Sequence, residues 1–268
     1  MKIATMALKN VFRNKRRTML TILSIVAGIV TMVLFDGFVC YTLWGLQEST
    51  IRNGYGHLQI SSSEEYFLTG SFDPFSYLLH NEQEVTRRLK ALPKVKAVIP
   101  ELMFSGTLGS MEKSGIITVQ AVPPDESSAL LSFRSIIEGR DIFPTDRYCV
   151  VLTKGVAKKL NAKIGDIMTM MAITQGGGIN AIDVEVVGIA SSGLGELDNI
   201  LVYMDLASAK EFLWVENVPR LLVVLEKTEY TDDVYTTFVN KIAPQLEQPV
   251  AIKKWHELAE YYQQVHGF

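Results

Sequence analysis

The stretch TMLTILSIVAGIVTMVLF, residues 18–35, contains eighteen consecutive residues without a charge. It follows directly on a basic cluster of Arg13, Lys15, Arg16 and Arg17. A helix of about 20 apolar residues spans the roughly 30 Å hydrocarbon layer of a membrane. Backbone groups inside lipid find hydrogen-bond partners only within a helix or a closed barrel. The stretch therefore predicts a transmembrane helix.

A cleaved signal peptide is the alternative interpretation of this stretch. The apolar part of a signal peptide usually has about 7 to 15 residues and is followed by small residues. Here the run is longer, and Phe38, Tyr41 and Trp44 follow it. We therefore expect an uncleaved anchor. Basic residues flank only its N-terminal end, so the positive-inside rule predicts a cytoplasmic N-terminus and a main domain on the outer side.

Charge divides the chain at the same place. The first 17 residues carry six basic and no acidic side chains, which leaves 20 basic against 29 acidic residues and a net charge of −9 in the remainder. The basic segment has apolar residues at helical spacing, so we expect it to lie on the anionic membrane lipids. The outer domain is acidic, so its composition does not indicate nucleic-acid binding. The only two cysteines, Cys40 and Cys149, belong to different expected elements, and we expect no structural disulfide.

The region after the apolar helix contains the pattern β-α-β twice. The pattern places the strands and helices at residues 57–61, 82–92 and 95–98, the last strand resuming after Pro100, and again at residues 221–225, 231–246 and 250–252. Two such units forming one sheet give the split βαβ, ferredoxin-like plan. The two units are far apart in sequence, so we expect an insertion between them.

The insertion is predicted to be mainly β. Its strands are expected at residues 148–152, 166–173, 182–189 and 201–204, its helices at 154–160 and 206–213, and a hairpin turn at Gly176, Gly177 and Gly178. The fold class is thus a membrane-anchored α+β protein. Its expected parts are a cytoplasmic amphipathic segment (1–17), a transmembrane helix and stalk (18–52), the split βαβ domain (53–124 and 214–254), the inserted β-rich subdomain (125–213) and the start of a second stalk helix (255–268).

We predict no catalytic, metal or cofactor site. The triple glycine is followed by a strand, whereas a phosphate-binding loop precedes a helix and usually contains Lys and then Ser or Thr. The four histidines lack zinc-like spacing. Ser191 and Ser192 lack the flanking glycines of a hydrolase nucleophile.

Several segments resemble one known family in their order and spacing. They are ALKNVFRNKRRTMLTILSI (7–25), GHLQI (56–60), EGR (138–140), VVLTKGVAKKLNAKIGD (150–166), VEVVGIASSGLGELDN (184–199) and VYMDLASAKEFL (202–213). The chain thereby resembles the permease subunits of MacB/FtsX-type ABC transporters, which include lipoprotein-releasing, LolC/LolE-like permeases. The resemblance implies a porter-like split βαβ domain, in agreement with the periodicity.

The resemblance also implies a function. The chain would be a non-catalytic permease subunit of the inner membrane that transmits ATP-driven motion to a periplasmic or extracellular domain for export or lipoprotein release. Its implied partners are a cytoplasmic ABC ATPase, a second permease copy or paralogue, and a periplasmic partner or lipoprotein. The alternative is a single-pass extracytoplasmic binding or regulatory module without transport activity.

The end of the sequence departs from the family pattern. Family members have four transmembrane helices, whereas residues 255–268, WHELAEYYQQVHGF, look like a stalk entering a second one. The chain is then either a fragment of a permease or a natural truncation that needs a partner.

One loop and one turn are candidates for contact with a partner. The segment SSGLGELDN (191–199) has two glycines that break strand and helix patterns, with Leu194 and Leu197 among polar neighbours. We expect a surface loop there. The candidate contact residues are Leu194 and Leu197 in this loop, and Gly177 and Gly178 at the hairpin turn.

The basic cluster leads to a prediction about topology. Reporter fusions or thiol labelling in intact cells should place the N-terminus inside and Cys149 outside, because basic flanks are retained in the cytoplasm. A cytoplasmic position of Cys149 would contradict the whole interpretation.

Overall fold

The computed structural model describes residues 15–70, 73–110, 113–131, 134–193, 195 and 197–259. The chain divides into two compact units, residues 1–48 and 49–268. The basic segment 1–17 lies outside the described residues except for Lys15, Arg16 and Arg17, and so does the end of segment 255–268 after residue 259.

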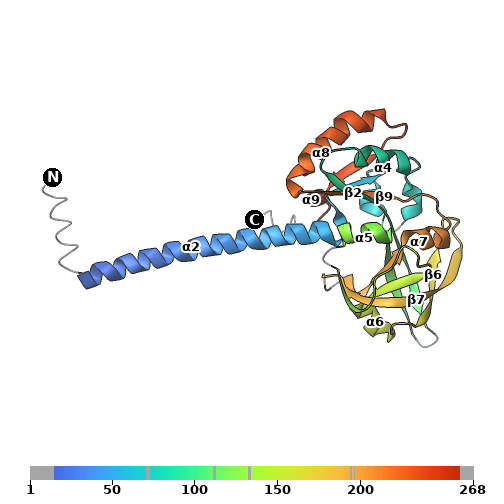
Figure 1. Ribbon diagram of the computed structural model, residues 1–268, viewed down its shortest axis with the longest axis horizontal. Coiled ribbons are helices and arrows are strands. Elements are labelled where there is room, and N and C mark those ends of the chain that lie inside the picture. The colour runs from blue at the N-terminus through green and yellow to red at the C-terminus, as the bar shows by residue number, and fades with distance from the viewer. Residues whose placement is uncertain are drawn as a thin grey trace. The chain divides into compact units, whose positions relative to one another are not determined.

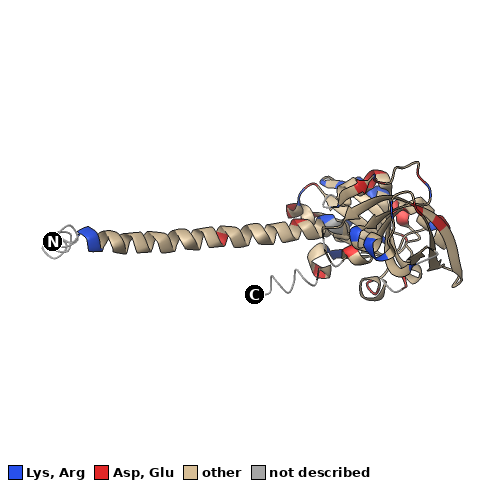
Figure 2. Cartoon of the chain, turned by 90° about the horizontal axis from the view of Figure 1, so that it is seen from below, with Lys and Arg blue, Asp and Glu red and all other residues tan. Residues whose placement is uncertain are grey.

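The first unit is dominated by one helix, α2 (Lys15–Thr50), which has 36 residues and is long and apolar enough to cross a membrane. Figure 2 shows basic residues at its start and few charged residues beyond them. The hydroxyls of Thr21, Ser24, Thr31 and Thr42 each donate to the carbonyl four residues earlier, at 2.8 to 3.0 Å. These polar side chains are thereby satisfied within the helix, as a lipid environment requires. The expectation of one long apolar N-terminal helix is confirmed.

The second unit is a mixed α/β domain with one large sheet (Figure 1). Its strands are β1 (Leu58–Ser61), β2 (Val95–Gly109), β3 (Ser114–Val122), β4 (Ser135–Gly139), β5 (Cys149–Thr153), β6 (Ile167–Ile173), β7 (Ile179–Ser191), β8 (Leu201–Asp205), β9 (Arg220–Leu225) and β10 (Ala251–Lys254). Its α-helices are α3 (Tyr66–Thr69), α4 (Glu82–Lys90), α5 (Pro124–Leu130), α6 (Lys154–Leu160), α7 (Leu206–Leu213), α8 (Thr231–Thr237) and α9 (Trp255–Leu258).

The first and last parts of this domain form a four-stranded antiparallel arrangement in the order β10-β1-β9-β2. Helix α4 connects β1 to β2, and α8 lies between β9 and β10. One face of these strands packs against the helices through a core that includes Leu58, Val85, Val223 and Phe238. Alternate residues, such as Leu222 and Val224, belong to a second core on the other face.

β2 also closes a ring with five further strands, and β4 pairs with β7 outside this ring. β2 pairs with β3, β3 with β8, β8 with β5, β5 with β7, β7 with β6, and β6 again with β2. The ring is therefore a six-stranded barrel whose inward side chains form a packed core, as in other small barrels. β2 and β3 lie within segment 53–124, so the barrel takes strands from both sides of the expected division at residue 124. That division stays a prediction.

Two expected elements differ in the structure. The strand expected to stop at Val98 and resume after Pro100 is continuous, since Pro100 pairs opposite Leu221 inside β2. The single helix expected over residues 231–246 is three successive pieces, α8, the π-helix η5 (Phe238–Ile242) and the 3-10 helix η6 (Ala243–Gln245). Pro244 lacks a backbone N–H and cannot continue a regular α-helix.

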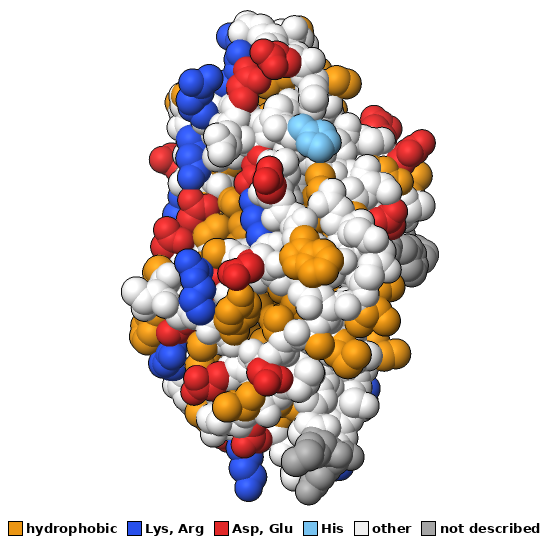
Figure 3. Space-filling view, turned by 90° about the vertical axis from the view of Figure 1, so that its right-hand side faces the viewer, with side chains coloured by type: hydrophobic (Ala, Val, Ile, Leu, Met, Phe, Trp, Pro, Cys, Tyr) orange, Lys and Arg blue, Asp and Glu red, His pale blue; other side chains and the backbone are white. Residues whose placement is uncertain are grey.

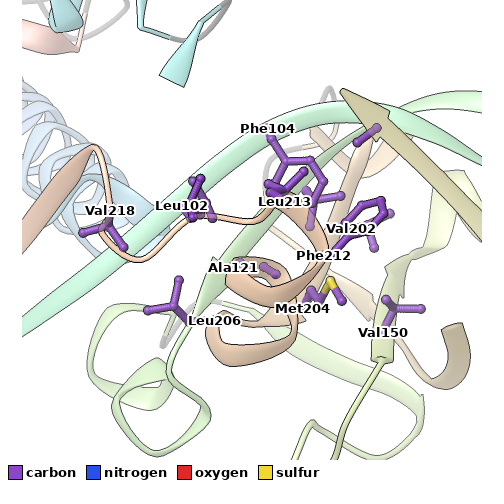
Figure 4. Packing of buried hydrophobic residues seen from close by; sticks show 14 of the residues in the cluster. Leu102, Phe104, Ala121, Val150, Val202, Met204, Leu206, Phe212, Leu213 and Val218 are labelled. Atoms are coloured by element: carbon purple, nitrogen blue, oxygen red, sulfur yellow. The ribbon is translucent and has the colours of Figure 1, made fainter. Parts of the chain in front are cut away.

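Helix α7 covers one end of the barrel. Figure 4 shows its residues Phe212 and Leu213 directed toward Phe104, Val202 and Met204 of the strands. Phe212 is 1 % exposed, and its ring lies 6.0 Å from that of Phe104, centroid to centroid. This contact joins the helix to β2.

The packing of α7 predicts a large loss of stability in Phe212→Ala. Removing a buried phenylalanine costs about 3–5 kcal/mol through lost burial and the cavity left behind. Phe143→Ala is the matched control, because Phe143 is 53 % exposed and its replacement should cost much less. Urea unfolding measures both, and equal losses would show that α7 is not part of the core.

Candidate functional site

A short π-helix, η1 (Ile51–Tyr55), follows α2 and is held closely against the sheet. Gly54 has a φ of +109°, and a Cβ there would lie 2.8 Å from Gln120 Nε2. Gly56 has a φ of +63°, and its Cβ would lie 3.1 Å from the carbonyl oxygen of Val223. Both positions need glycine, for the left-handed backbone and for the close approach. π-Helical turns occur frequently at functional sites.

The two ends of the domain meet at η1. Ile51 forms a small buried cluster with Trp255 and Ala259, and the N–H of Trp255 donates to the carbonyl of His57 at 3.1 Å. Nδ1 of His57 accepts from the N–H of Leu225 at 3.1 Å, so Nε2 carries the proton toward Thr228 Oγ1 at 3.2 Å. The residues that follow α2 are thus bound to β9, since the N–H of His57 donates to the carbonyl of Val223 at 2.8 Å. β10, which precedes Trp255, pairs with β1.

A buried polar network lies beside η1. The Glu101 carboxylate is bound by Arg220 Nε and, at 2.6 Å, by Gln120 Nε2. Arg220 Nη1 donates to Gln59 Oε1 at 3.1 Å, and Gln59 Nε2 donates to the carbonyl of Tyr55 at 3.0 Å. Glu101 is fully buried and Gln59 is 1 % exposed. Burial opposes the charge on Arg220, but the adjacent Glu101 carboxylate outweighs this and raises the guanidinium pKa.

A cavity of about 280 Å³ opens above this network. Its wall includes Tyr55 of η1, Tyr66 and Phe67 of α3, and Met103 of β2. Tyr66 is 7 % exposed. Burial raises the pKa of Tyr66, Arg220 lowers it and Glu101 raises it, which places the phenol in the field of the network. Apolar side chains therefore share the cavity lining with the polar side chains of Gln59, Thr118, Gln120 and Arg220.

The loop expected to contact a partner is shaped by the buried carboxylate of Asp198. The Asp198 carboxylate accepts hydrogen bonds from the backbone N–H and the hydroxyl of Ser192, both at 2.7 Å, and from Ser191 Oγ at 3.0 Å. Lys154 Nζ lies 2.9 Å away. Burial raises the pKa of Asp198, but these hydrogen bonds outweigh it and the pKa is lowered.

Of the two leucines named in this loop, Leu194 lies outside the described residues. Leu197 begins a 3-10 turn, η3 (Leu197–Asn199), is half-buried against the second core, and lines the 280 Å³ cavity. The exposed position expected for Leu197 is therefore corrected, because Asp198 holds the turn against the domain. Its role in contact with a partner stays a prediction.

The expected hairpin at the triple glycine is present between β6 and β7. Gly177 has a φ of +79°, and both Gly177 and Gly178 have open space around the Cβ position or ordinary contact only. The N–H of Gln175 donates to the carbonyl of Leu213 at 3.1 Å, which fixes the turn beside the end of α7. Trp214 follows there, 64 % exposed and with a φ of +58°. The turn thus lies beside the end of α7, whereas Leu197 packs against the second core.

No group of three or more His, Cys, Asp or Glu side chains that could hold a metal ion is found among the described residues. Burial raises the pKa of the Cys149 thiol, with Asp146 and Glu185 adding to the effect, and Cys149 is 6 % exposed. A thiol in this state is protonated and unreactive.

Figure 3 shows acidic and basic side chains interspersed on one face of the domain, with hydrophobic side chains gathered between them.

One apolar helix and an α/β domain built of a sheet and a barrel define a membrane-anchored domain without a recognisable active-site constellation in its described residues. The chain belongs to the family of MacB-like periplasmic core domains, whose sequence model matches residues 18–239. This places it in the MacB/FtsX-type family of ABC transporter permease components, which are not themselves catalytic.

The similar proteins agree with this family. The chain is 26 % identical over 142 residues to the lipoprotein-releasing system transmembrane protein LolE of Haemophilus influenzae, a match that covers 50 % of this chain and 34 % of LolE. The periplasmic region of MacB from Actinobacillus actinomycetemcomitans superposes with a TM-score of 0.55 at 13 % identity, covering 81 % of this chain and 96 % of that one.

The extracellular domain of the noncanonic ABC-type transporter YknZ from Gram-positive bacteria gives a TM-score of 0.52 at 18 % identity, with 74 % of this chain and 99 % of that chain covered. At such identities the solved structures show the fold alone. The match to LolE spans about a third of that protein's length.

The buried network predicts that Glu101→Gln destabilises the domain strongly. Breaking one partner of a buried ion pair leaves the other charge uncompensated, at a cost of about 3–5 kcal/mol. Glu84→Gln removes the partner of Arg88 in a half-exposed pair on α4 and should cost at most about 1 kcal/mol. Chemical denaturation measures the free energy of unfolding of both variants. If Glu101→Gln leaves this free energy unchanged, the ion pair contributes no stability.

Proposed function

We propose that the chain is part of the membrane subunit of an ABC transporter of the MacB/FtsX/Lol type, which transmits ATP-driven motion to its outer domain. The family match over residues 18–239 carries this proposal, because it includes both the apolar helix and the domain. ATP binding by a cytoplasmic ATPase would move the helices, and the outer domain would follow.

The strand order supports a finer interpretation of the domain. The arrangement β10-β1-β9-β2, with α4 and α8 as the two connecting helices, is that of two interleaved β-α-β units in an antiparallel sheet. We interpret it as the porter-like split βαβ domain, with the barrel built largely from the inserted segment.

The attachment of η1 supports transmission of motion. α2 is continuous to Thr50, and η1 begins at Ile51. η1 and α9 share the buried cluster of Ile51, Trp255 and Ala259. A displacement of either segment would therefore act on β9 and β1 directly, since a packed interior does not deform continuously.

The basic residues at the start of α2 support a cytoplasmic N-terminus in an inner membrane, with the domain on the periplasmic or extracellular side. The implied partners are a cytoplasmic ABC ATPase, a second permease copy or paralogue, membrane lipids, and a periplasmic partner or lipoprotein. The exposed hairpin turn at Gly177 and Gly178 and the loop of Leu194 and Leu197 are the proposed contacts for the last of these.

The experiment is reconstitution with an ATPase. The full chain is purified in lipid nanodiscs alone and after co-expression with an ABC ATPase of the MacB/Lol type, and ATP turnover is measured. We expect no turnover by the chain alone, because its sequence contains no phosphate-binding loop. Co-purification and turnover that stops when the ATPase's catalytic glutamate is replaced would support the proposal.

Two results would contradict it. Turnover by the chain alone would make it an enzyme. A folded chain that neither binds the ATPase nor alters its rate would favour the single-pass binding or regulatory module.

Cys149 is buried, so the thiol-labelling arm of the topology test needs a cysteine introduced at an exposed position, such as Gln175→Cys.

A further inference from the structure

The cavity beside η1 has the composition of a ligand site. We propose that it binds a small, neutral, mostly apolar molecule, with a planar aromatic body and a hydrogen-bond-accepting carbonyl. The cavity measures about 280 Å³, near the lower end of the range of about 300–1,000 Å³ that is usual for ligand sites. Such sites combine apolar walls with a few convergent polar groups and occur preferentially between domains. This one lies where the four-stranded arrangement joins the barrel.

Charge decides the class of ligand. The cavity lining includes one cation, Arg220, which is already paired with the fully buried Glu101 carboxylate. An anionic ligand would place a second negative charge beside fully buried Glu101 with only one guanidinium to compensate both. A cationic ligand would face Arg220. A neutral molecule avoids both costs, because it adds no uncompensated charge to a buried site.

Two donors on the cavity wall have weak or missing partners. Arg220 Nη2 donates to the sulfur of Met103 at 2.9 Å, and a thioether is a weak acceptor. The Tyr66 hydroxyl makes no hydrogen bond to another residue that the structure describes, although Tyr66 is 7 % exposed. A carbonyl oxygen placed between them would give both donors a full acceptor.

The walls select the body of the ligand. Tyr55, Tyr66 and Phe67 contribute three aromatic rings to the lining, and aromatic rings pack favourably against one another in offset or edge-to-face arrangements. Water is the other possible occupant, because ordered water also satisfies buried polar groups. Water alone would leave the apolar wall without a partner.

The experiment compares three probes of equal shape and different charge: benzamide, benzoate and benzamidine. Their binding to the full chain in nanodiscs is measured by ligand-observed NMR, with empty nanodiscs subtracted. We expect benzamide to bind and the charged probes to bind at least about tenfold more weakly. Tyr66→Phe should weaken benzamide about two- to tenfold, the value of one hydrogen bond.

Two further variants separate the site from the fold. Thr118→Phe fills the cavity from β3, and phenylalanine is well tolerated in strands; it should abolish binding. If that variant does not fold, Ile200→Phe takes its place, since Ile200 lines the cavity and is 42 % exposed. Tyr77→Phe is the control, because the Tyr77 ring packs against Tyr66 at 5.9 Å but does not line the cavity.

Binding of benzamide that is lost in Thr118→Phe and kept in Tyr77→Phe would support the site. Absence of benzamide binding, stronger binding of benzoate or benzamidine, or binding that persists in folded Thr118→Phe would each overturn it. The outcome is independent of the proposed transport function, because no ATPase is present in the experiment.

Discussion

Strand β2 is the constraint on which the rest of the domain depends. Its residues from Val95 to Glu101 pair with β9 in the four-stranded arrangement, and those from Leu102 to Gly109 pair with β3 in the barrel. One continuous backbone therefore belongs to two substructures. A strand has a side-chain period of two, so its register fixes which residues face which core in both parts at once. The sheet and the barrel cannot rotate independently without breaking this strand.

The change from one substructure to the other falls beside the polar network. Glu101 is the last residue of β2 that pairs with β9, and it meets Arg220 at the first residue of β9. Gln120 reaches the same carboxylate from β3. An apolar contact here would be non-directional, whereas charge-assisted hydrogen bonds require a defined geometry. The network thus specifies how the two parts join, and the cavity beside it follows from that junction.

The described structure and the family agree on a domain of an ABC transporter permease component, a class of protein that is not itself catalytic. Its polar clusters have structural roles where their contacts are known. Asp198 holds a loop through Ser191 and Ser192, and His57 links the end of η1 to β9 and Thr228. The residues with positive φ that are not glycine include Trp214, at the end of α7. A bulky residue in this conformation costs about 1–2 kcal/mol, and its indole is exposed beside the hairpin turn. Conflicts of this kind between local preference and fold concentrate at functional positions.

The sequence by itself determined the elements whose signal is local. The uncharged run of residues 18–35 defined the apolar helix, helices α6 and α7 have the expected bounds, and the triple glycine marked the hairpin between β6 and β7. The sequence does not predict β3, β4 or α5. β4 and α5 have five and seven residues, and such short elements carry little periodicity. Only the tertiary structure decided that β6 returns to β2 and closes the barrel, that Leu197 packs inward, and that Glu101, Arg220 and Gln120 meet. These contacts join residues more than 15 positions apart, and pairing over such distances depends on the packing of the whole domain, which no local pattern records.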